Sequence, residues 1–369
     1  MYLSKLSLIN FKNYDEAIFE FSPTINCFVG NNGVGKTNIL DSIHYLSLAK
    51  SFYSNIDSSN IRNSEDFFII EGTFFTEDNY DNIHCSFHRH KQKILKRNGK
   101  EYQKLSDHIG RYPVVMISPI DSALITGGSS ERRKFLNKVI SQYNSLYLDS
   151  VMNYNKALLQ RNKLLKDLNN MGKFDSEMLE VWDTQLIKYG EYIFSERQKF
   201  GIALIPVFDE YYAFISSGNE KVKLTYCSQL QEASFAELLL KSADKDRILE
   251  YTTTGIHKDD MIFELNGYPL KIFGSQGQQK SFLVALKLAK FDYLKRKAGF
   301  APILLLDDIF DKFDSERVEK IIDLAGNNHF GQIFITDTDE VRMRNVLSRF
   351  NVDYRLFRIE KGNKILVIS

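Results

Sequence analysis

Eight residues near the N-terminus have the types and the spacing that bind phosphate groups. Gly30 to Thr37 read Gly-Asn-Asn-Gly-Val-Gly-Lys-Thr, which is the pattern G-x-x-x-x-G-K-T. Glycines let the backbone bend until consecutive N–H groups point inward at phosphate oxygens. In such a loop the Lys36 ammonium reaches the β- and γ-phosphates, and the Thr37 hydroxyl binds Mg²⁺. The chemistry that this stretch predicts is the binding of a nucleoside triphosphate.

The segments on both sides of this loop have the character that it needs. Residues 25–29 form a short apolar run, which is typical of a buried strand. After the loop, four apolar residues share one face of an expected helix: Ile39, Leu40, Ile43 and Leu46. The positive end of that helix points at the same site as the loop. Strand, loop and helix follow in the right order, which argues against a glycine-rich turn that holds no ligand.

A second set of candidate residues lies towards the C-terminal end of the chain. Residues 303–306 are apolar and predict a buried strand, and two carboxylates, Asp307 and Asp308, follow directly. Such a strand brings Asp307 beside a phosphate loop, where it holds Mg²⁺ directly or through water. Asp308 is then expected next to the attacking water, as general base or as the residue that positions it. A buried strand with an acidic end and no metal is the alternative, and the phosphate loop in the same chain disfavours it.

A third candidate stretch, Ser275-Gln-Gly-Gln-Gln, lies between the first two and opens an expected helix. Its serine and the backbone N–H groups at the helix N-terminus suit a γ-phosphate. The expected catalytic residues are Lys36, Asp307, Asp308 and Ser275, and the expected metal ligands are Thr37 and Asp307. The expected nucleotide contacts are Gly30, Asn31, Asn32, Gly33, Val34, Gly35, Lys36, Thr37, Asn38, Ser275, Gly277 and Gln278.

The combination of these three stretches resembles the ATP-binding-cassette (ABC) ATPases, and among them the DNA-repair branch that includes structural-maintenance-of-chromosomes proteins and RecF. The similarity to the RecF family is the closer one. It rests on five motifs that follow in order from the first ten residues to beyond residue 300: Leu8–Tyr14, Ser129–Leu136, Gly255–Asp260, Ser275–Lys280 and Asp307-Asp308.

This resemblance implies an α/β fold, with a split P-loop ABC-type ATPase lobe and an inserted, mainly helical lobe. It implies ATP and Mg²⁺ as cofactors and an ATP-dependent homodimer, in which the Ser275 segment of one subunit faces the phosphate loop of the other. RecF proteins recognise gapped DNA at single-strand/double-strand junctions and act with RecO and RecR to load RecA. The implied roles are recombinational repair, replication restart and the SOS response. Hydrolysis in the family is slow and DNA-stimulated, so ATP acts chiefly as a switch for dimerisation.

Three positions depart from the pattern that is common among cassette ATPases. Asp308 stands where many of them have Glu, as in RecF, and its shorter side chain reaches the attacking water less well, which agrees with a switch. Asp311 opens a segment that usually begins with a small residue such as Ser, so cross-subunit contacts there stay open. Asp337 follows the strand at 333–336 where transporters have His, so the sequence gives no support for a γ-phosphate sensor there.

The chain divides into three parts by its sequence character. We expect an N-terminal part of the ATPase lobe at 1–128, a helical arm at 129–217 and a C-terminal part of the lobe at 218–369. In the arm, Ser129 or Ser130 is the expected N-cap of one long helix that ends near residue 168. The further expected elements are helices at 176–199, 202–215 and 233–240, a strand at 222–227, and hairpins that turn at Asn98-Gly99 and at Asn266-Gly267, the second between strands 261–265 and 270–273.

Composition limits the class of protein. The 369 residues are 43% hydrophobic and 26% charged, which is typical of a globular protein with a sizeable core. No apolar run has the length of a membrane span, and the N-terminus has no signal-peptide pattern. Three scattered cysteines do not make a disulfide framework. We therefore expect a cytoplasmic protein with no membrane partner.

Contacts with DNA have to come from local basic patches, because the net charge is only +1. Two clusters are candidates, with surface solvation as the alternative for each: Lys91, Lys93, Lys96, Arg97 and Lys100, and Arg132, Arg133 and Lys134. Arg161, Lys163 and Lys166 are expected on a solvated helix face, with a DNA-gripping surface as the alternative. Nothing predicts base-specific contacts, so we expect recognition of the DNA backbone.

Other classes of function and of site fit parts of the sequence. A transporter ATPase normally has His after Thr336, and a Rad50- or condensin-like machine needs a coiled coil far longer than residues 129–215. A DNA clamp that retains nucleotide without turnover stays open, because slow turnover and none look alike in a sequence. A metal site is conceivable at one cluster, although no second half of a zinc motif accompanies it: His84, Cys85, His88 and His90.

Overall fold

Two six-stranded sheets and a helix that contacts both of them carry the phosphate loop. The structure is a computed structural model, and it describes residues 1–76, 79–170, 177–216, 218, 220–308, 330–348, 353–362 and 364–368. The chain separates into two compact units. The first unit is made of Met1–Asp121 and Val284–Ser369, and the second is made of Ser122–Leu283.

The bounds of these units differ from the expected division at 128/129 and 217/218. Residues 218–283, expected with the ATPase lobe, group with the helices of the second unit. The reason is a ribbon of β9 (Val222–Cys227) and β10 (Asp260–Leu265), which lies against the long helix α5 (Glu180–Ser216). Tyr226 on β9 meets Phe194 on α5, with ring centroids 6.3 Å apart.

The mainly parallel sheet of the first unit sets up the site. Its strand order is β15-β14-β3-β13-β12-β8, and all neighbouring pairs except β14–β15 are parallel. The strands are β3 (Ile25–Val29), β8 (Val114–Ile117), β12 (Ile303–Leu306), β13 (Ile333–Asp337), β14 (Tyr354–Ile359) and β15 (Ile365–Val367). Every residue of β3, β8, β12 and β13 is buried, and most of these residues are apolar, as in other parallel sheets that are covered on both faces. Because their carboxyl ends meet at one edge, the segments that follow β3, β8 and β12 come together there.

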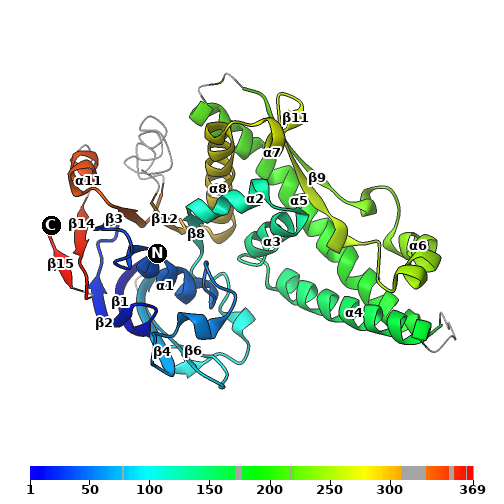
Figure 1. Cartoon of the computed structure of the whole chain (residues 1–369), viewed down its shortest axis with the longest axis horizontal. Helices are drawn as coiled ribbons and strands as arrows, with labels where there is room; N and C mark the ends of the chain where they lie inside the picture. The colour runs from blue at the N-terminus through cyan, green and yellow to red at the C-terminus, as the bar shows by residue number, and fades with distance from the viewer. Residues whose placement is uncertain are drawn as a thin grey trace. The chain divides into compact units, whose positions relative to one another are not determined.

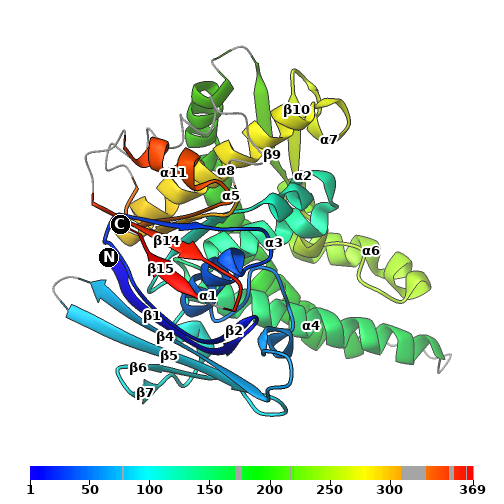
Figure 2. The ribbon, with the colours of Figure 1, turned by 60° about the vertical axis from the view of Figure 1, so that its left-hand side comes forward.

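The second sheet of this unit is antiparallel and has the order β2-β1-β4-β5-β6-β7, as Figure 2 shows. Its strands are β1 (Tyr2–Phe11), β2 (Tyr14–Glu20), β4 (Phe67–Thr76), β5 (Asn79–His88), β6 (Ile94–Arg97) and β7 (Lys100–Glu101). Leu6 and Leu8 are buried while Lys5 is exposed, so one face of β1 packs on the core. The predicted hairpin turn is confirmed, because Asn98 and Gly99 both have positive φ, 51° and 78°.

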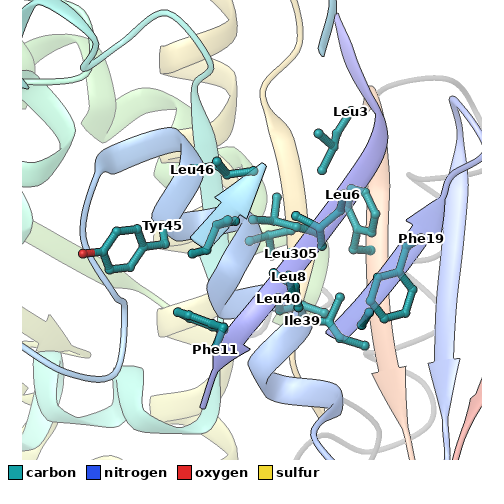
Figure 3. Packing of buried hydrophobic residues seen from close by; sticks show 14 of the residues in the cluster. Leu3, Leu6, Leu8, Phe11, Phe19, Ile39, Leu40, Tyr45, Leu46 and Leu305 are labelled. Carbon is teal, nitrogen blue, oxygen red and sulfur yellow. The ribbon is translucent and has the colours of Figure 1, made fainter. Parts of the chain in front are cut away.

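Helix α1 (Lys36–Leu48) joins the two sheets into one core. It contacts β1, β4 and β5 of the antiparallel sheet and β8 and β13 of the parallel sheet. Figure 3 shows Ile39, Leu40 and Leu46 of this helix among Leu6 and Leu8 of β1 and Leu305 of β12. Each fully buried side chain of this size contributes about 1.5–3 kcal/mol. The first residue of α1 is therefore held in place by packing along the rest of the helix.

The second unit consists mainly of helices, of which α4 and α5, drawn in green, are the longest (Figure 1). Its elements are α2 (Ala123–Thr126), α3 (Ser129–Ile140), α4 (Ser145–Asn170), α5, β9, α6 (Phe235–Leu249), β10, β11 (Tyr268–Pro269) and α7 (Leu270–Phe273). Helix α8 (Gln276–Ala298) begins in this unit and ends in the first. The remaining described elements are the 3₁₀ turns Asp57–Asn60, Leu105–Asp107, Pro119–Ser122, Glu177–Leu179, Gln229–Gln231 and Ile256–Lys258, and α11 (Glu340–Leu347).

The predicted long helix from 129 to 168 was wrong, because two helices, α3 and α4, occupy this stretch. Asn144 starts the second one, since its side-chain oxygen accepts a hydrogen bond from the Tyr147 N–H at 2.9 Å. The N-cap of α3 is Gly128 rather than Ser129 or Ser130, and Ser129 is already helical.

Three further predictions for the second unit were also wrong. Helix α5 runs without a break through Gly201 and Pro206, because its buried stripe continues through Phe200, Leu204 and Val207. The segment Leu270–Phe273 is the short helix α7 rather than a strand: the ladder to β10 ends at the Glu264–Pro269 pair, and the Gly274 N–H then donates to the Leu270 carbonyl at 2.9 Å. Helix α6, capped by Ser234, extends to Leu249 and is longer than predicted. None of the helices in the described part of the chain combines the length and hydropathy that crossing a bilayer requires.

Candidate nucleotide-binding site

The phosphate loop joins the end of β3 to the start of α1. Gly30, Gly33 and Gly35 have φ of 149°, 81° and 111°, a region that other residues rarely adopt. A Cβ on Gly30 would lie 2.3 Å from the Ile359 carbonyl oxygen, and one on Gly35 would lie 2.4 Å from the Asn13 amide nitrogen. The loop therefore needs glycines both for their positive φ angles and because neighbouring atoms leave no space for a Cβ at Gly30 and Gly35. The backbone N–H groups at the start of α1 have no side-chain cap at Gly35, which suits an anion.

Lys36 lies across this loop. Its ammonium is buried and donates hydrogen bonds to the carbonyl oxygens of Gly30 at 2.7 Å and Asn31 at 3.0 Å. The positive charge is thus held beside the N–H groups of the loop, where phosphate oxygens would replace the carbonyls as acceptors. The contact of Lys36 with the β- and γ-phosphates stays a prediction.

Asn13 supports the loop from the turn between β1 and β2. Its side chain donates to the Val34 carbonyl at 3.0 Å and accepts from the Asn38 amide at 2.6 Å. Asn13 also lines a pocket of about 600 Å³ whose other walls are Lys12, Ser59, Ile61, Arg62, Asn63, Ser64 and Glu65. The sequence placed Asn13 in a family-like motif but gave it no role. Its contacts connect the loop to a pocket beside it.

The end of β12 brings the first of the two carboxylates to the loop. Asp307 Oδ1 accepts a hydrogen bond from the Thr37 hydroxyl at 2.9 Å, although 270 positions separate them in the chain. Asp307 is 4% exposed, and its second neighbour on this side is the Thr336 hydroxyl at 3.0 Å. Two oxygens of the kind that Mg²⁺ prefers therefore converge beside the phosphate loop, so the residues present fit this ion.

Asp308 has an unusual backbone at the same edge of the sheet. Its φ is 45°, in the left-handed region that costs a residue with a side chain about 1 kcal/mol or more. Thr336 holds it there, because the Asp308 N–H donates to the threonine hydroxyl at 2.8 Å. The Thr336 hydroxyl also lies 3.0 Å from Asp307 Oδ1 and 3.3 Å from Asp308 Oδ1, so both neighbouring carboxylates are near this one hydroxyl. Thr336 was not predicted as part of the site.

Tyr53 and Ser118 lie at the other oxygen of Asp307. The tyrosine hydroxyl donates to Asp307 Oδ2 at 2.5 Å and lies 2.8 Å from Ser118 Oγ. Burial, and after it the charge of Asp307, raise the pKa of Tyr53, so its hydroxyl stays protonated and donates. Sequence reasoning missed both residues. Ser118 could have been found, because it follows a strand that pairs in parallel with β12, whereas Tyr53 lies in a loop without a motif.

Asp337 also lies at this edge, but its carboxylate is used within the chain. Both of its oxygens meet the Arg342 guanidinium, and Oδ1 accepts from the Thr338 N–H at 2.6 Å. The side chain is 1% exposed. These contacts fix the turn into α11 and leave the carboxylate buried. Asp311, the other position that departs from the family pattern, lies outside the described residues.

The third candidate stretch lies in the second unit, at the start of α8. Ser275 Oγ accepts from the Gln278 N–H at 3.2 Å, and Gln278 Oε1 accepts from the Ser275 N–H at 2.7 Å. This reciprocal pair is a capping box, which holds the first turn of the helix. Gln278 also donates to Glu220 at 2.7 Å. Ser275 is exposed and Gly277 partly exposed, so this turn presents its serine to the surface rather than to the core.

Several basic residues that were candidates for DNA contacts are engaged within the chain. Lys93 pairs with Asp57 at 2.9 Å, Arg97 with Asp81 at 2.9 Å, Arg132 with Asp260 at 2.6 Å and Lys134 with Glu131 at 2.7 Å, while Arg133 donates to the Asp259 carbonyl at 2.7 Å. The expectation of a solvated Arg161 was wrong, because it is 1% exposed and pairs with Asp183 and Asp246. Lys163 and Lys166 are exposed, as expected.

The histidine cluster on β5 has other contacts. His84 Nδ1 lies 2.7 Å from Glu71 Oε1, and Cys85 is buried on the opposite face of the strand. Within the described ranges, no group of three or more His, Cys, Asp or Glu side chains is arranged to hold a metal ion.

The motif Gly255–Asp260 belongs to a buried network in the second unit. Gly255 has φ 121°, and a Cβ there would lie 2.5 Å from the Phe235 ring. His257 lies between the Tyr154 hydroxyl at 2.8 Å and the Thr252 carbonyl at 3.0 Å, and burial lowers the pKa of His257 to about 4. Asp259 pairs with the buried Arg197 at 2.6 Å. Within this unit the motif therefore shapes the fold.

Comparison with known proteins gives one consistent answer. A family model described as the RecF/RecN/SMC N terminal domain matches residues 2–362. The chain is 48% identical over 363 residues to the DNA replication and repair protein RecF of Bacteroides fragilis, covering 98% of this chain and 97% of that protein. It is 49% identical over 362 residues to the RecF of Parabacteroides distasonis, covering 98% of each.

A solved structure described as the recombination mediator protein RecF-ATP in the RecFOR pathway has a TM-score of 0.89 to this chain. The sequences are 28% identical, and the match covers 100% of this chain and 98% of that one. These similarities confirm the predicted fold class, an α/β split P-loop ATPase lobe with an inserted, mainly helical lobe.

Proposed function

Because the chain belongs to the RecF family of DNA replication and repair proteins, we propose that its first unit binds ATP together with Mg²⁺. The observation that carries this proposal is the 2.9 Å contact between the Thr37 hydroxyl and Asp307 beside a glycine-shaped phosphate loop. The related RecF structure that contains ATP supports the choice of nucleotide. Bound Mg²⁺ would neutralise phosphate charge, and Thr37 and Asp307 would hold it.

The proposed positions of the phosphates also imply where the base and ribose would lie. Lys36 and Asp307 mark the γ-phosphate end, so the base and ribose extend from the other end, past Asn38. Asn38 is bonded to Asn13, which lines the pocket of about 600 Å³. This pocket is the proposed place for the nucleoside. Binding of a fluorescent ATP analogue to the wild type and to Asn13→Ala tests it, and an unchanged affinity would contradict the assignment.

The proposed reaction is slow hydrolysis of ATP that serves as a switch. Asp308 would act on the attacking water, as general base or by positioning it, and its shorter side chain than Glu agrees with a low rate. Replacing Asp308 with Asn should lower the rate of phosphate release while ATP affinity stays within a few-fold of wild type. An unchanged rate would remove Asp308 from the reaction and favour the alternative, a DNA clamp that retains nucleotide without turnover.

We propose further that ATP drives dimerisation, with the Ser275 turn of one subunit at the phosphate loop of the other. The exposure of Ser275 and its capping box, which fixes the turn, support a role in contacting a partner. Molecular mass in solution tests this for wild type and Lys36→Met, each with and without ATP–Mg²⁺. The proposal requires a dimer only for wild type with ATP. A mass that does not respond to nucleotide would overturn it.

The proposed partner of the closed dimer is gapped DNA, bound through its backbone, with RecO and RecR as further partners in loading RecA. Recombinational repair, replication restart and the SOS response are the proposed roles, in the cytoplasm. In the proposed division of labour, residues 1–128 and 218–369 serve the ATPase and residues 129–217 form the arm. The exposed Lys163 and Lys166 are candidates for phosphate contacts. Changing both to Ala should reduce the salt dependence of DNA binding if they contact phosphates.

A further inference from the structure

The loop after α1 places a tyrosine against the carboxylate that faces Thr37. Tyr53 Oη is 2.5 Å from Asp307 Oδ2, and Ser118 Oγ is 2.8 Å from the same hydroxyl and 3.5 Å from the same carboxylate oxygen. On the other side, Asp307 Oδ1 meets Thr37 at 2.9 Å and Thr336 at 3.0 Å. The two oxygens of one carboxylate thus have separate sets of neighbours, and only Oδ1 faces the phosphate loop.

The position of Tyr53 is fixed by a second carboxylate, Asp41. Its side chain is fully buried and accepts from the Ser51 hydroxyl and the Phe52 N–H, both at 2.6 Å. Ser51 Oγ in turn accepts from the Tyr53 N–H at 3.2 Å. Asp41 also pairs with Lys12 at 2.5 Å, and the Lys12 ammonium lies 5.3 Å from the centre of the Tyr53 ring. Ser51 therefore holds the backbone of Tyr53, and Lys12 lies over one face of its ring.

Helix α1 connects these two arrangements. Thr37 and Asp41 are four residues apart, so they lie on the same face of the helix. Thr37 meets Asp307 directly, and Asp41 holds the loop whose tyrosine meets Asp307 from the other side. Helix α1 thus fixes the neighbours of both carboxylate oxygens of Asp307, Thr37 directly and Tyr53 through Asp41.

We propose that Tyr53 is a positioning residue for the metal site, which holds Asp307 so that Oδ1 faces Thr37 and the Mg²⁺ that both would bind. This inference rests on the proposed ATP–Mg²⁺ site and adds a residue that sets its affinity for the metal. A carboxylate that binds a metal through one oxygen needs its other oxygen held, or it rotates away from the productive direction. Loss of such an outer partner typically weakens metal affinity by about 10–100-fold.

A matched control exists in the same unit. Tyr112 donates its hydroxyl to Asp81 at 2.8 Å, so Tyr112 and Asp81 form a tyrosine–aspartate pair like Tyr53 and Asp307; Tyr112 is buried, whereas Tyr53 is half-buried. Asp81 lies on β5 of the antiparallel sheet, outside the residues assigned to the site. Removing either hydroxyl deletes one tyrosine–carboxylate hydrogen bond, so a general effect on folding should appear in both variants.

The test compares wild type, Tyr53→Phe, Tyr112→Phe and Ser118→Ala. The first quantity measured is the affinity for a fluorescent ATP analogue in EDTA. The second is the Mg²⁺ concentration that gives half of the increase in affinity that the metal causes. Mn²⁺ bound in the presence of nucleotide is followed by electron paramagnetic resonance, which reports the metal without turnover. Tyr53→Phe should raise the half-saturating metal concentration about 10-fold and leave affinity in EDTA unchanged. Ser118→Ala should give a smaller rise and Tyr112→Phe none.

Two results would overturn the inference. One is a metal dependence of Tyr53→Phe equal to that of wild type. The other is an equal loss of affinity with and without metal, which would make Tyr53 a residue of the general architecture. A wild type that binds the nucleotide equally well with and without Mg²⁺ would instead refute the proposed metal site, and with it this inference.

Discussion

Polar side chains in the interior have different roles in the two units. In the second unit, the Arg197 guanidinium donates to Asp259 at 2.6 Å and to the Ile256 carbonyl at 2.8 Å, so one element is tied to another. In the first unit, the oxygens of Thr37 and Asp307 converge next to backbone N–H groups that suit an anion. Both regions carry conspicuous sequence motifs. The difference teaches that a motif marks a ligand site only where its polar groups converge on one point instead of neutralising each other.

The largest effect should come from breaking the ion pair of the second unit. Arg197→Met leaves Asp259 as a buried carboxylate without its cation, which should lower the free energy of unfolding by about 3–5 kcal/mol. Urea denaturation measures it, with Lys199→Met, exposed on the same helix, as control. A loss below 1 kcal/mol would show that the network does not hold this unit together.

The loop lysine of the first unit should behave in the opposite way. Lys36→Met removes the ammonium that would make two charge-assisted contacts with phosphate oxygens in the proposed site; such contacts together are worth about 3 kcal/mol, so ATP affinity should fall about 100-fold. Unfolding by urea should change little. Titration with a fluorescent ATP analogue checks the affinity, and a large loss of stability with affinity retained would reverse the comparison between the units.

Gly255 gives an intermediate effect on the second unit. An alanine there adds a Cβ 2.5 Å from the Phe235 ring and 2.7 Å from the Tyr154 hydroxyl, at a φ of 121°. Strain and overpacking should cost about 2 kcal/mol of stability. Gly128→Ala is the control, because its Cβ would meet nothing within 4 Å. Thermal unfolding compares them, and equal melting temperatures would show that the space around Gly255 adapts.

Acid should weaken both units by smaller and similar amounts. Burial lowers the pKa of His108 in the first unit and of His257 in the second to about 4. An unfolded histidine takes up its proton near pH 6.5, whereas the folded one stays neutral, so stability is complete above pH 6.5 and falls as the pH drops towards 4. Between pH 7 and pH 5.5, each of these two histidines should lower the free energy of unfolding by about 1 kcal/mol. Urea denaturation at both pH values checks this, and His257→Gln should show about half the dependence.

The sequence predicts the site as far as its motifs and the geometry of parallel sheets allow. Gly30 to Lys36 form a local turn, and Asp307 follows a strand of the same sheet, so their meeting can be expected from strand ends alone. Tyr53 and Asn13 could not be found in this way, because the path of a loop brings Tyr53 to Asp307 and a turn brings Asn13 to the phosphate loop. Thr336 could have been found, because it lies at the end of β13, which pairs in parallel with β12.

The helical parts of the chain were predicted less well for a physical reason. Periodicity shows that a helix has an apolar face, but it does not show which polar residues the neighbouring helices cover. Arg161 was therefore expected in solvent, although it is buried against Asp183 and Asp246. The break between α3 and α4 depends on one capping side chain, Asn144, in a sequence that could continue as a helix.

The measurement that tests the central claim most directly is the effect of Mg²⁺ on ATP affinity in wild type and Asp307→Asn. The asparagine keeps the size of the side chain and removes the charge that would hold the metal. If the site lies between Thr37 and Asp307, Mg²⁺ should tighten binding to wild type and have little effect on the variant, while both bind equally in EDTA. An Asp307→Asn protein that still gains the full wild-type affinity on adding Mg²⁺ would contradict the account.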